Sequence, residues 1–227
     1  MKKHLWVILS TVIVLAVLFS CVKPEETASV SITLDGDLSD WGSLLYEDSN
    51  NDCVWGNNEL YKAGITFDST NLYIAGVYKR TDNDFLCLVD LSTLVGATNT
   101  MNWNWHKHYT FSKGDIDIIF DSWDSGFGAF KVTSDTVTEI TEEASVVVIK
   151  ADDGTITVEA KIPLSTIGAT NTELLKVNAA FALTGGYWDG IGKQFVGDFY
   201  PEQGYTLPSD GGITGPATIT SFIKFPK

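Results

Sequence analysis

The sequence predicts an all-β fold, an antiparallel two-sheet β-sandwich of the jelly-roll kind. Short runs rich in β-branched and aromatic residues recur along the chain, turn-forming clusters such as 35–37 and 152–154 separate them, and no long stretch keeps a helical period. Many short strands with closely spaced turns are typical of two packed sheets. The predicted strands are 30–34, 62–67, 72–78, 85–91, 115–120, 129–132, 146–150, 155–162, 177–183 and 218–225.

The run 155–162 gives the clearest strand signal. Its apolar residues, from Ile156 to Ile162, alternate with polar residues, from Thr155 to Lys161. A period of two predicts one buried face and one face in water. Pro163 then ends the strand, and a short helical turn is expected after it. We find no internal repeat, so the sequence predicts a single domain over residues 30–227.

The first 29 residues predict a signal-peptide helix and a tether. Lys2 and Lys3 precede an apolar run, 5–19, that is shorter than the roughly 20 residues a membrane-spanning helix needs. Leu-Phe-Ser-Cys at 18–21 resembles the lipobox of bacterial lipoproteins, which implies a signal peptide over 1–20 and a lipid on Cys21. The polar segment 21–29 is expected to be a tether. The alternative is a membrane helix that ends at Cys21.

The charge of the chain limits its partners. Removing residues 1–20 takes away two of the 15 Lys and Arg and none of the 29 acids, so the net charge becomes 13 minus 29, or -16. Nucleic acid is excluded as a partner, because phosphate binding needs a basic face. Clustered carboxylates suit oxygen-ligated cations such as calcium.

Two cysteines remain once Cys21 carries a lipid. An oxidising compartment would permit a disulfide between Cys53 and Cys87. Two buried thiols are the alternative, since the sequence does not fix the distance between the two Cα atoms.

The segment that begins at Asp48 has the oxygen spacing of a calcium loop. Asp48, Asn50 and Asp52 are the predicted metal ligands, and Glu59 falls where the twelfth position of an EF-hand would be. Cys53 stands where that loop needs glycine and no flanking helices are evident, so we predict no EF-hand. An Asn- and Asp-rich turn is the alternative.

A second acidic set is compatible with calcium if the fold brings its carboxylates together. It comprises Asp115, Asp117, Asp121 and Asp124. Alternation places Asp115 and Asp117 on one face.

Three stretches resemble the family-nine carbohydrate-binding modules and the related C-terminal domain of glucodextranase-like proteins. Segment 32–41 contains an Asp-Gly pair followed by an acidic residue and a Trp. Segment 67–75 is a turn followed by Leu-Tyr, and segment 158–168 contains a Glu, an Ile-Pro pair and then a Leu and a Gly. Segments 197–201 and 215–219 match more weakly. The resemblance implies a β-sandwich that binds carbohydrate outside the cell, often with structural calcium and with aromatic rings stacked on sugar. No binding residue is carried over by motif.

Aromatic residues beside amides are the candidate sugar contacts. A pyranose stacks its C–H face on a flat ring, and its hydroxyls need directional partners. Trp103, Trp105 and Tyr109 share one face if their segment is extended, whereas Trp188 lies in a Gly-rich loop. The alternative is that these rings are core. The predicted carbohydrate-binding residues are Trp103, Trp105, Tyr109, Trp123, Trp188 and Asp189.

The sequence predicts no enzyme, because it holds no nucleophile elbow, metalloprotease motif, phosphate loop or dinucleotide fingerprint. A pair of carboxylates for glycoside hydrolysis is the alternative, because the sequence does not show how far apart its many acids lie. His106 and His108 offer a transition-metal pair, and Met101 with either His offers haem ligation, but no Cys-x-x-Cys-His motif is present.

We therefore expect a non-catalytic module, lipid-anchored outside the cytoplasm to the bacterial cell membrane or outer membrane. Its expected partner is an oligo- or polysaccharide, and calcium is the expected cofactor. A structural or protein-docking sandwich, with an envelope protein as partner, is the alternative. A haem-binding domain is the third hypothesis.

Overall fold

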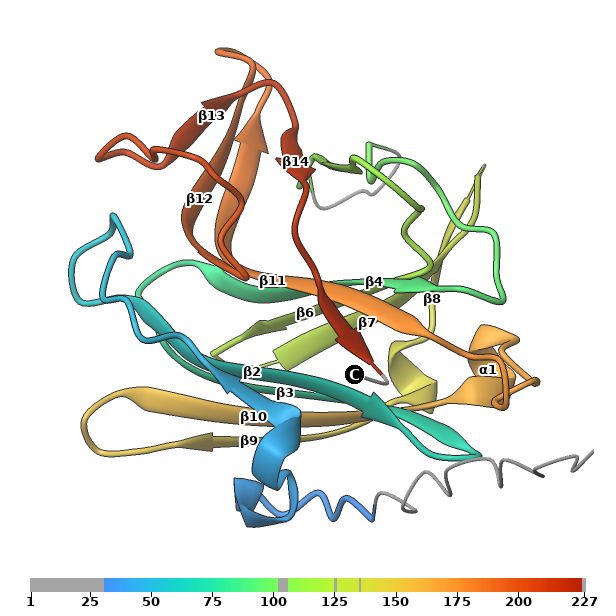
Figure 1. Ribbon diagram of the computed structural model, residues 1–227. Coiled ribbons are helices and arrows are strands. Elements are labelled where there is room, and N and C mark those ends of the chain that lie inside the picture. Colours follow the sequence, from blue (N-terminus) through green and yellow to red (C-terminus); the bar gives the residue numbers. More distant parts are fainter. Residues whose placement is uncertain (1–30, 102–105, 125, 135, 226–227) are drawn as a thin grey trace, which may run out of the picture.

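The computed structural model describes residues 31–101, 106–124, 126–134 and 136–225, which form a sandwich of two antiparallel sheets (Figure 1). Residues 1–30, with the expected signal peptide, Cys21 and tether, lie outside the described residues. The strands are β1 (Leu45–Glu47), β2 (Glu59–Phe67), β3 (Asn71–Lys79), β4 (Asp84–Leu91), β5 (Tyr109–Phe111), β6 (Ile118–Trp123), β7 (Gly126–Val132), β8 (Val137–Glu139), β9 (Ser145–Lys150), β10 (Thr155–Pro163), β11 (Val177–Trp188), β12 (Lys193–Tyr200), β13 (Gly212–Thr214), β14 (Ala217–Ile219) and β15 (Ile223–Phe225). The helical turns are α1 (Leu164–Ile167) and the 3-10 turns Leu38–Asp40, Gly42–Leu44 and Thr141–Glu143. Among the described residues no helix has the length and apolar character to cross a membrane.

The two sheets lie one above the other (Figure 1). The lower sheet has the order β1-β2-β3-β10-β9, and the upper sheet has the order β13-β12-β11-β4-β6-β7-β8, with β15 added beside β11. A short parallel pair, β5 with β14, lies apart from both. The predicted all-β sandwich is confirmed. The prediction missed five strands, namely β1, β5, β8, β12 and β13, and run 218–225 is divided between β14 and β15.

The main core fills the space between the sheets. The apolar residues that alternate along β10, from Ile156 to Ile162, are buried as predicted, and they pack with inward residues of β4, β6 and β11. The ring of Phe85 lies between Tyr78 and Phe181, with centroid distances of 5.0 Å and 5.7 Å. Burial of such large side chains is the main stabilising term in a sandwich.

The N-terminal segment covers the outer face of the lower sheet. Residues 31–34 form no strand, so the prediction for 30–34 is wrong there. Side chains hold the segment instead: the buried carboxylate of Glu159 accepts hydrogen bonds from Trp41 Nε1 at 2.8 Å and from the amide of Gly36 at 2.6 Å. Glu159 was expected in water, and it is buried because this segment lies over it.

Replacing Glu159 with alanine should release the N-terminal segment. The indole N–H of Trp41 and the amides of Asp35 and Gly36 would lose a charged acceptor, and each such hydrogen bond contributes about 1.5 to 3 kcal/mol. We expect a loss of about 3 kcal/mol in the free energy of unfolding, measured by urea denaturation. Lys161→Ala, on the same outer face of β10, is the control; equal stability of the two variants would contradict this function of Glu159.

A second core lies on the outer face of the upper sheet. Residues 97–101 and 106–116 and strand β14 cover that face, and they bury Tyr109, Ile116 and Ile219 against Leu88 and Ile119. Tyr109 thereby belongs to the core. Two layers therefore lie above the lower sheet, the upper sheet and the segments that cover it.

Cys53 and Cys87 are free thiols, so the expected alternative of a disulfide is not realised; Cys87 lies in the main core and Cys53 in the loop before β2.

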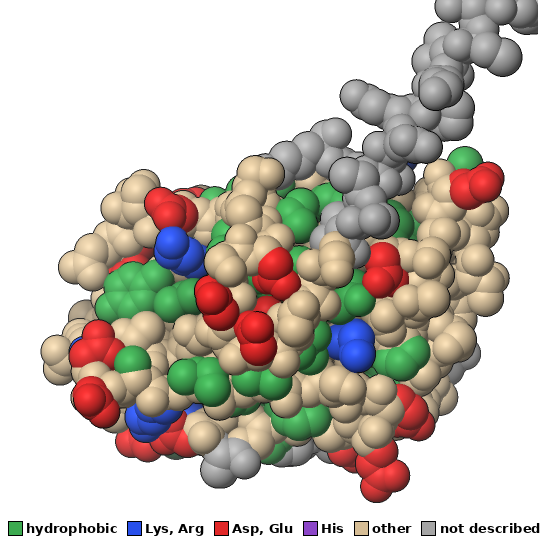
Figure 2. Space-filling model, turned by 90° about the horizontal axis from the view of Figure 1, so that it is seen from below, with side chains coloured by type: hydrophobic (Ala, Val, Ile, Leu, Met, Phe, Trp, Pro, Cys, Tyr) green, Lys and Arg blue, Asp and Glu red, His purple; other side chains and the backbone are tan. Residues whose placement is uncertain are grey.

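Seen from below, the surface carries many acidic side chains and few basic ones (Figure 2).

Candidate functional site

The first candidate site is an exposed aromatic residue at the end of the upper sheet. Strand β11 ends at Trp188, and the turn to β12 closes with hydrogen bonds from the amides of Ile191 and Gly192 to the carbonyl of Trp188. Gly192 has a φ of +64°, and a Cβ at Gly190 would lie 3.1 Å from Trp188 Nε1. The glycines therefore allow a tight turn that leaves Trp188 61% exposed.

Polar and aromatic groups of segment 106–109 surround this turn. The amide of Tyr187 donates to the carbonyl of His106, and the ring of His108 stacks on Tyr187 with centroids 3.9 Å apart. His106 Nδ1 lies 3.9 Å from Asp189 Oδ2, and both side chains are exposed. Burial lowers the pKa of His108 below its usual value, which keeps this imidazole neutral at pH 7. We call Trp188, Tyr187, Asp189, His106 and His108 the aromatic site.

A buried ion cluster holds segment 106–109 on the upper sheet. Lys107 Nζ lies 2.5 Å from Asp84 Oδ2 and 2.5 Å from Asp121 Oδ2, and the Lys107 side chain is only 4% exposed. The amide of His108 donates to Gln194 Oε1 at 2.7 Å. These contacts fix the backbone beneath the aromatic site, so the site is preorganised.

The structure separates the six predicted sugar-binding residues. Trp188 and Asp189 are exposed side by side in the turn. Trp123 is half-buried at the end of β6, two strands away from β11 in the same sheet. Trp103 and Trp105 lie outside the described residues. The prediction for Tyr109 is wrong: its side chain is fully buried and its hydroxyl donates to Thr184 Oγ1, so it cannot stack on a ligand.

The second candidate site is a group of four carboxylates, which we call the acidic centre. It comprises Asp48, Asp52, Glu59 and Asp198, whose potential ligand oxygens all lie within 4.8 Å of one another. Asp48 follows β1, Glu59 begins β2 and Asp198 comes from β12. Hydrogen bonds from Val54 N to Gly197 O and from Leu60 N to Asp198 Oδ2 attach the loop to β12.

Trp55 fixes this loop against β12. Its indole N–H donates to the carbonyl of Asp210 at 3.1 Å, and its ring packs where Gly197 and Gly211 have no side chain. A Cβ at Gly211 would lie 2.8 Å from the Trp55 ring. The two glycines therefore permit the close approach that brings the loop acids to Asp198.

Electrostatics in the acidic centre favour a cation. Burial and the neighbouring carboxylates raise the pKa of Glu59 to about 7 and that of Asp198 to about 8. Glu59 Oε1 and Asp48 Oδ2 are buried and have no hydrogen-bond partner among the described residues. Carboxylate oxygens are the ligands of hard cations such as calcium, so these residues fit the cofactor that the sequence predicted.

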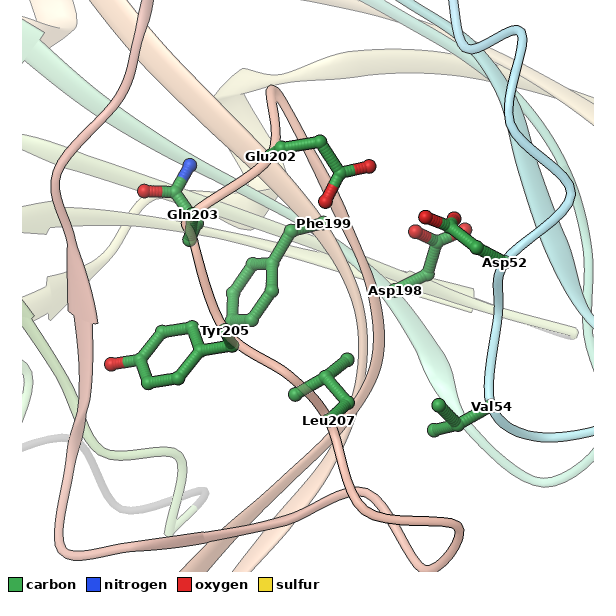
Figure 3. A pocket seen from close by; sticks show the side chains of 8 residues that line it. All are labelled: Asp52, Val54, Asp198, Phe199, Glu202, Gln203, Tyr205 and Leu207. Atoms are coloured by element: carbon green, nitrogen blue, oxygen red, sulfur yellow. The ribbon is translucent and has the colours of Figure 1, made fainter.

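A cavity of about 200 Å³ opens beside the acidic centre (Figure 3). The carboxylate of Glu202 points toward Asp52 and Asp198 from one side of it, and the stacked rings of Phe199 and Tyr205, 5.6 Å apart, line another side. Burial followed by the charge of Asp52 raises the pKa of Glu202. The cavity leaves room for water to complete a calcium shell, because calcium takes six to eight oxygens.

The predicted metal ligands are partly brought together. Asp48 and Asp52 belong to the acidic centre, whereas Asn50 Nδ2 faces Glu202 Oε1 at 3.5 Å and remains a prediction as a ligand. Sequence reasoning noted the position of Glu59 only to reject an EF-hand, and it missed Asp198. No local signal marks Asp198 as a ligand, because its partners lie far away in the sequence.

The second predicted acidic set is divided. Asp115 and Asp117 meet Asp90, but Asp121 pairs with Lys107, and Asp124 lies on the surface near Arg80 and Lys150. The carboxylate groups are therefore split among three places. Among the described residues, neither His106 nor His108 belongs to a converging group of metal-ligand atoms.

No protein-family model matches the chain, and no curated protein matches it. The structure is similar to two solved structures of a carbohydrate binding module family 9 (CBM9) from Caldicellulosiruptor kristjanssonii, in complex with glucose and with cellotriose. Each is 13% identical to this chain, and each match covers 70% of this chain. The matches cover 76% of the chain with glucose and 74% of the chain with cellotriose, and their TM-scores are 0.34 and 0.33. Family-nine carbohydrate-binding modules are what this chain is similar to in structure.

Proposed function

We propose that the protein is a non-catalytic module that binds a saccharide by stacking it on Trp188. The observation that carries this proposal is the 61% exposure of Trp188 in a tight turn that contains glycines. Leaving a large apolar ring in water forgoes about 1.5 to 3 kcal/mol of burial energy, and a stacked ligand recovers part of it. The resemblance of segments 32–41, 67–75 and 158–168 to carbohydrate-binding modules supports the same function.

The polar groups beside Trp188 suit sugar hydroxyls. The exposed Asp189 carboxylate accepts hydrogen bonds, and the exposed His106 imidazole can donate or accept one. A flat ring next to such groups gives a pyranose both of the contacts it needs. Because the contact surface is small, we expect modest affinity. Lipidation of Cys21 would hold the module at the outside of a bacterial membrane, as the sequence predicts.

Replacing Trp188 with alanine should weaken saccharide binding about tenfold or more. The loss corresponds to about 1.4 kcal/mol, which is part of the burial energy of a large ring. Binding would be measured by calorimetry and by tryptophan fluorescence with gluco-, xylo- and manno-oligosaccharides. Trp188→Phe keeps a flat ring and should retain most of the affinity.

The control is Leu174→Ala, which removes another exposed apolar side chain, 69% exposed, from a different loop. It should bind as the unchanged protein does. Equal binding by Trp188→Ala and Leu174→Ala would remove Trp188 from the site. If no saccharide bound, a protein-docking function would replace sugar binding.

We also propose that the acidic centre binds calcium and that the cation stabilises the fold. The support comes from four converging carboxylates, two buried oxygens without a partner among the described residues, and the raised pKa values of Glu59 and Asp198. The cation would neutralise charges drawn from β12 and from both ends of the loop between β1 and β2. It would thereby link the β1 edge of the lower sheet to the upper sheet.

A further inference from the structure

Strand β9 is the last strand of the lower sheet, and among the described residues it pairs only with β10 (Figure 1). The other strands that end a sheet, β1, β8 and β13, have three residues each, whereas β9 has six. Its pairing with β10 runs without a register shift. A long and regular edge strand leaves a row of open N–H and C=O groups, which can pair with a strand of another chain.

The side chains of β9 do not protect this edge. Val146 to Ile149 form an uninterrupted β-branched run, and segment 144–151 contains neither proline nor glycine. Val146 and Val148 pack against the main core but remain half-buried, and Ile149 on the outer face is 48% exposed. Natural edge strands carry inward charges, prolines or bulges that block pairing, and residues 145–149 have none of these. A further strand beside β9 would cover the flanks of its valines with cross-strand neighbours.

The hydrogen-bond pattern of β9 fits a second copy of the same strand. The amide of Ala151 donates to the carbonyl of Thr155, so alternate residues of β9 direct their backbone groups toward β10. The backbone groups of Val146 and Val148 therefore point to the open edge, and the side chains of these two residues face the main core. When two copies of β9 pair antiparallel around Val147, Val146 of each copy lies opposite Val148 of the other. Both sheets then keep their inner faces on the same side, so the core continues from one copy to the other.

Charges at the two ends of β9 favour this antiparallel pairing. The turn Thr141–Glu143 precedes the strand and exposes Glu142 and Glu143, whereas Lys150 ends the strand and is exposed. An antiparallel copy brings Lys150 beside the acidic turn of its partner, twice in each symmetric dimer. A parallel copy would place like charges together. Lys150 Nζ lies 3.3 Å from Asp124 Oδ1 of its own chain, but both side chains are more than half exposed, so the ammonium stays accessible.

We propose that β9 is a self-association surface, through which two copies of the chain join their lower sheets into one continuous sheet. The symmetry axis passes beside Val147 of each copy, so both copies use the same surface. The pairing satisfies the open backbone groups of the edge and covers the flanks of the valines. Because the paired strands are short, the interface is small and the dimer is weak. The surface shares no residue with the aromatic site or the acidic centre, so the inference goes beyond saccharide binding.

Cysteine cross-linking of the full chain tests this proposal. The two Val147 positions form a non-hydrogen-bonded pair with Cα atoms about 4.5 Å apart, a distance that suits a disulfide. Val147→Cys should therefore give a disulfide-linked dimer under mild oxidation. Ile149→Cys, on the same face of β9, is the matched control; its two copies lie about 13 Å apart along the strands and should cross-link about tenfold more slowly or less. The unchanged protein gives the background of the native cysteines.

Charge reversal distinguishes this pairing from random collision. In the Val147→Cys background, Lys150→Glu should slow cross-linking about tenfold, because two attractive pairs become repulsive. Adding Glu142→Lys to that variant exchanges the two charges and should restore the rate. Both positions are exposed, so the melting temperature should stay close to that of the unchanged protein.

The outcomes decide the proposal without reference to saccharide binding. Equal cross-linking of Val147→Cys and Ile149→Cys would overturn it, and so would an effect of Lys150→Glu that Glu142→Lys does not repair. Sedimentation equilibrium of the unchanged chain should show dimer at increasing concentration; a monomer at every concentration would also overturn it. Each of these results leaves the function of Trp188 untouched, so the two proposals fail separately.

Discussion

Lys107→Met should lower the free energy of unfolding by about 3 to 5 kcal/mol, the usual effect of leaving a buried charge without its partner. Lys107 Nζ lies 2.5 Å from a carboxylate oxygen of both Asp84 and Asp121, and the Asp121 side chain is 0% exposed. Methionine fills similar volume but carries no charge. Urea unfolding followed by tryptophan fluorescence would measure the change.

The loss should be larger at pH 8 than at pH 5. Burial raises the pKa of Asp121 to about 6 even though Lys107 lowers it, so without Lys107 that pKa would rise further. When the pKa of a carboxyl group is higher in the folded protein than in the unfolded one, the free energy of unfolding falls as the pH rises toward the folded pKa. The variant should therefore recover part of its stability in acid.

The exposed ion pair of Lys150 with Asp124 gives the control. Both side chains are more than half exposed, so Lys150→Met should cost less than about 1 kcal/mol. The double variant Lys107→Met with Asp121→Asn removes the buried unpaired charge and should regain stability relative to Lys107→Met alone. Equal stability of Lys107→Met and Lys150→Met would show that the buried cluster does not hold segment 106–109.

Chelation of calcium should lower the melting temperature by about 5 to 10 °C at pH 7.5. A ligand present at a hundred times its dissociation constant stabilises by about 2.7 kcal/mol, and each kcal/mol changes the melting temperature by about 2–4 °C in a domain of this size. The acidic centre supplies the physical reason, because its carboxylates repel one another when no cation is bound. Differential scanning calorimetry with calcium and with chelator measures the difference.

The pH dependence of the chelated protein follows from Glu59 and Asp198. Their pKa values of about 7 and about 8 are raised above the usual carboxyl range, so the folded state binds more protons than the unfolded state. The stability they contribute is present below about pH 4 and is lost as the pH rises through 7 to 8. Without calcium, the protein should therefore melt at a lower temperature at pH 8 than at pH 5. The stabilisation by calcium should be largest at pH 8.

Asp198→Asn tests the origin of this effect. It should reduce both the pH dependence and the stabilisation by calcium, whereas Asp210→Asn removes only an exposed carboxylate near Lys193 and should change neither. A melting temperature in chelator that rises from pH 5 to pH 8 would contradict the proposal for the acidic centre.

The sequence alone determined the fold class and several local features. A period of two in 155–162 predicted a half-buried strand, because successive side chains of a strand point to opposite faces. Pro163 predicted the end of that strand, and the structure places α1 immediately after it. The Gly-rich segment around Trp188 also indicated an exposed ring, because a tight turn of glycines offers little to bury it. The ring is exposed in the structure. The oxygen spacing of Asp48 and Asp52 predicted metal ligands, and the structure places both residues in the acidic centre.

Only the tertiary structure decided which residues share a site. Glu159 alternates as a surface residue should, yet Trp41 from the N-terminal segment buries it. Tyr109 has the same aromatic character as Trp188, but the parallel pairing of β5 with β14 places it in the core. Asp198 joins Asp48 and Glu59 because β12 lies beside their loop. Periodicity encodes which face a residue takes relative to its own strand, whereas these contacts depend on how distant strands and loops pack, which no local pattern records.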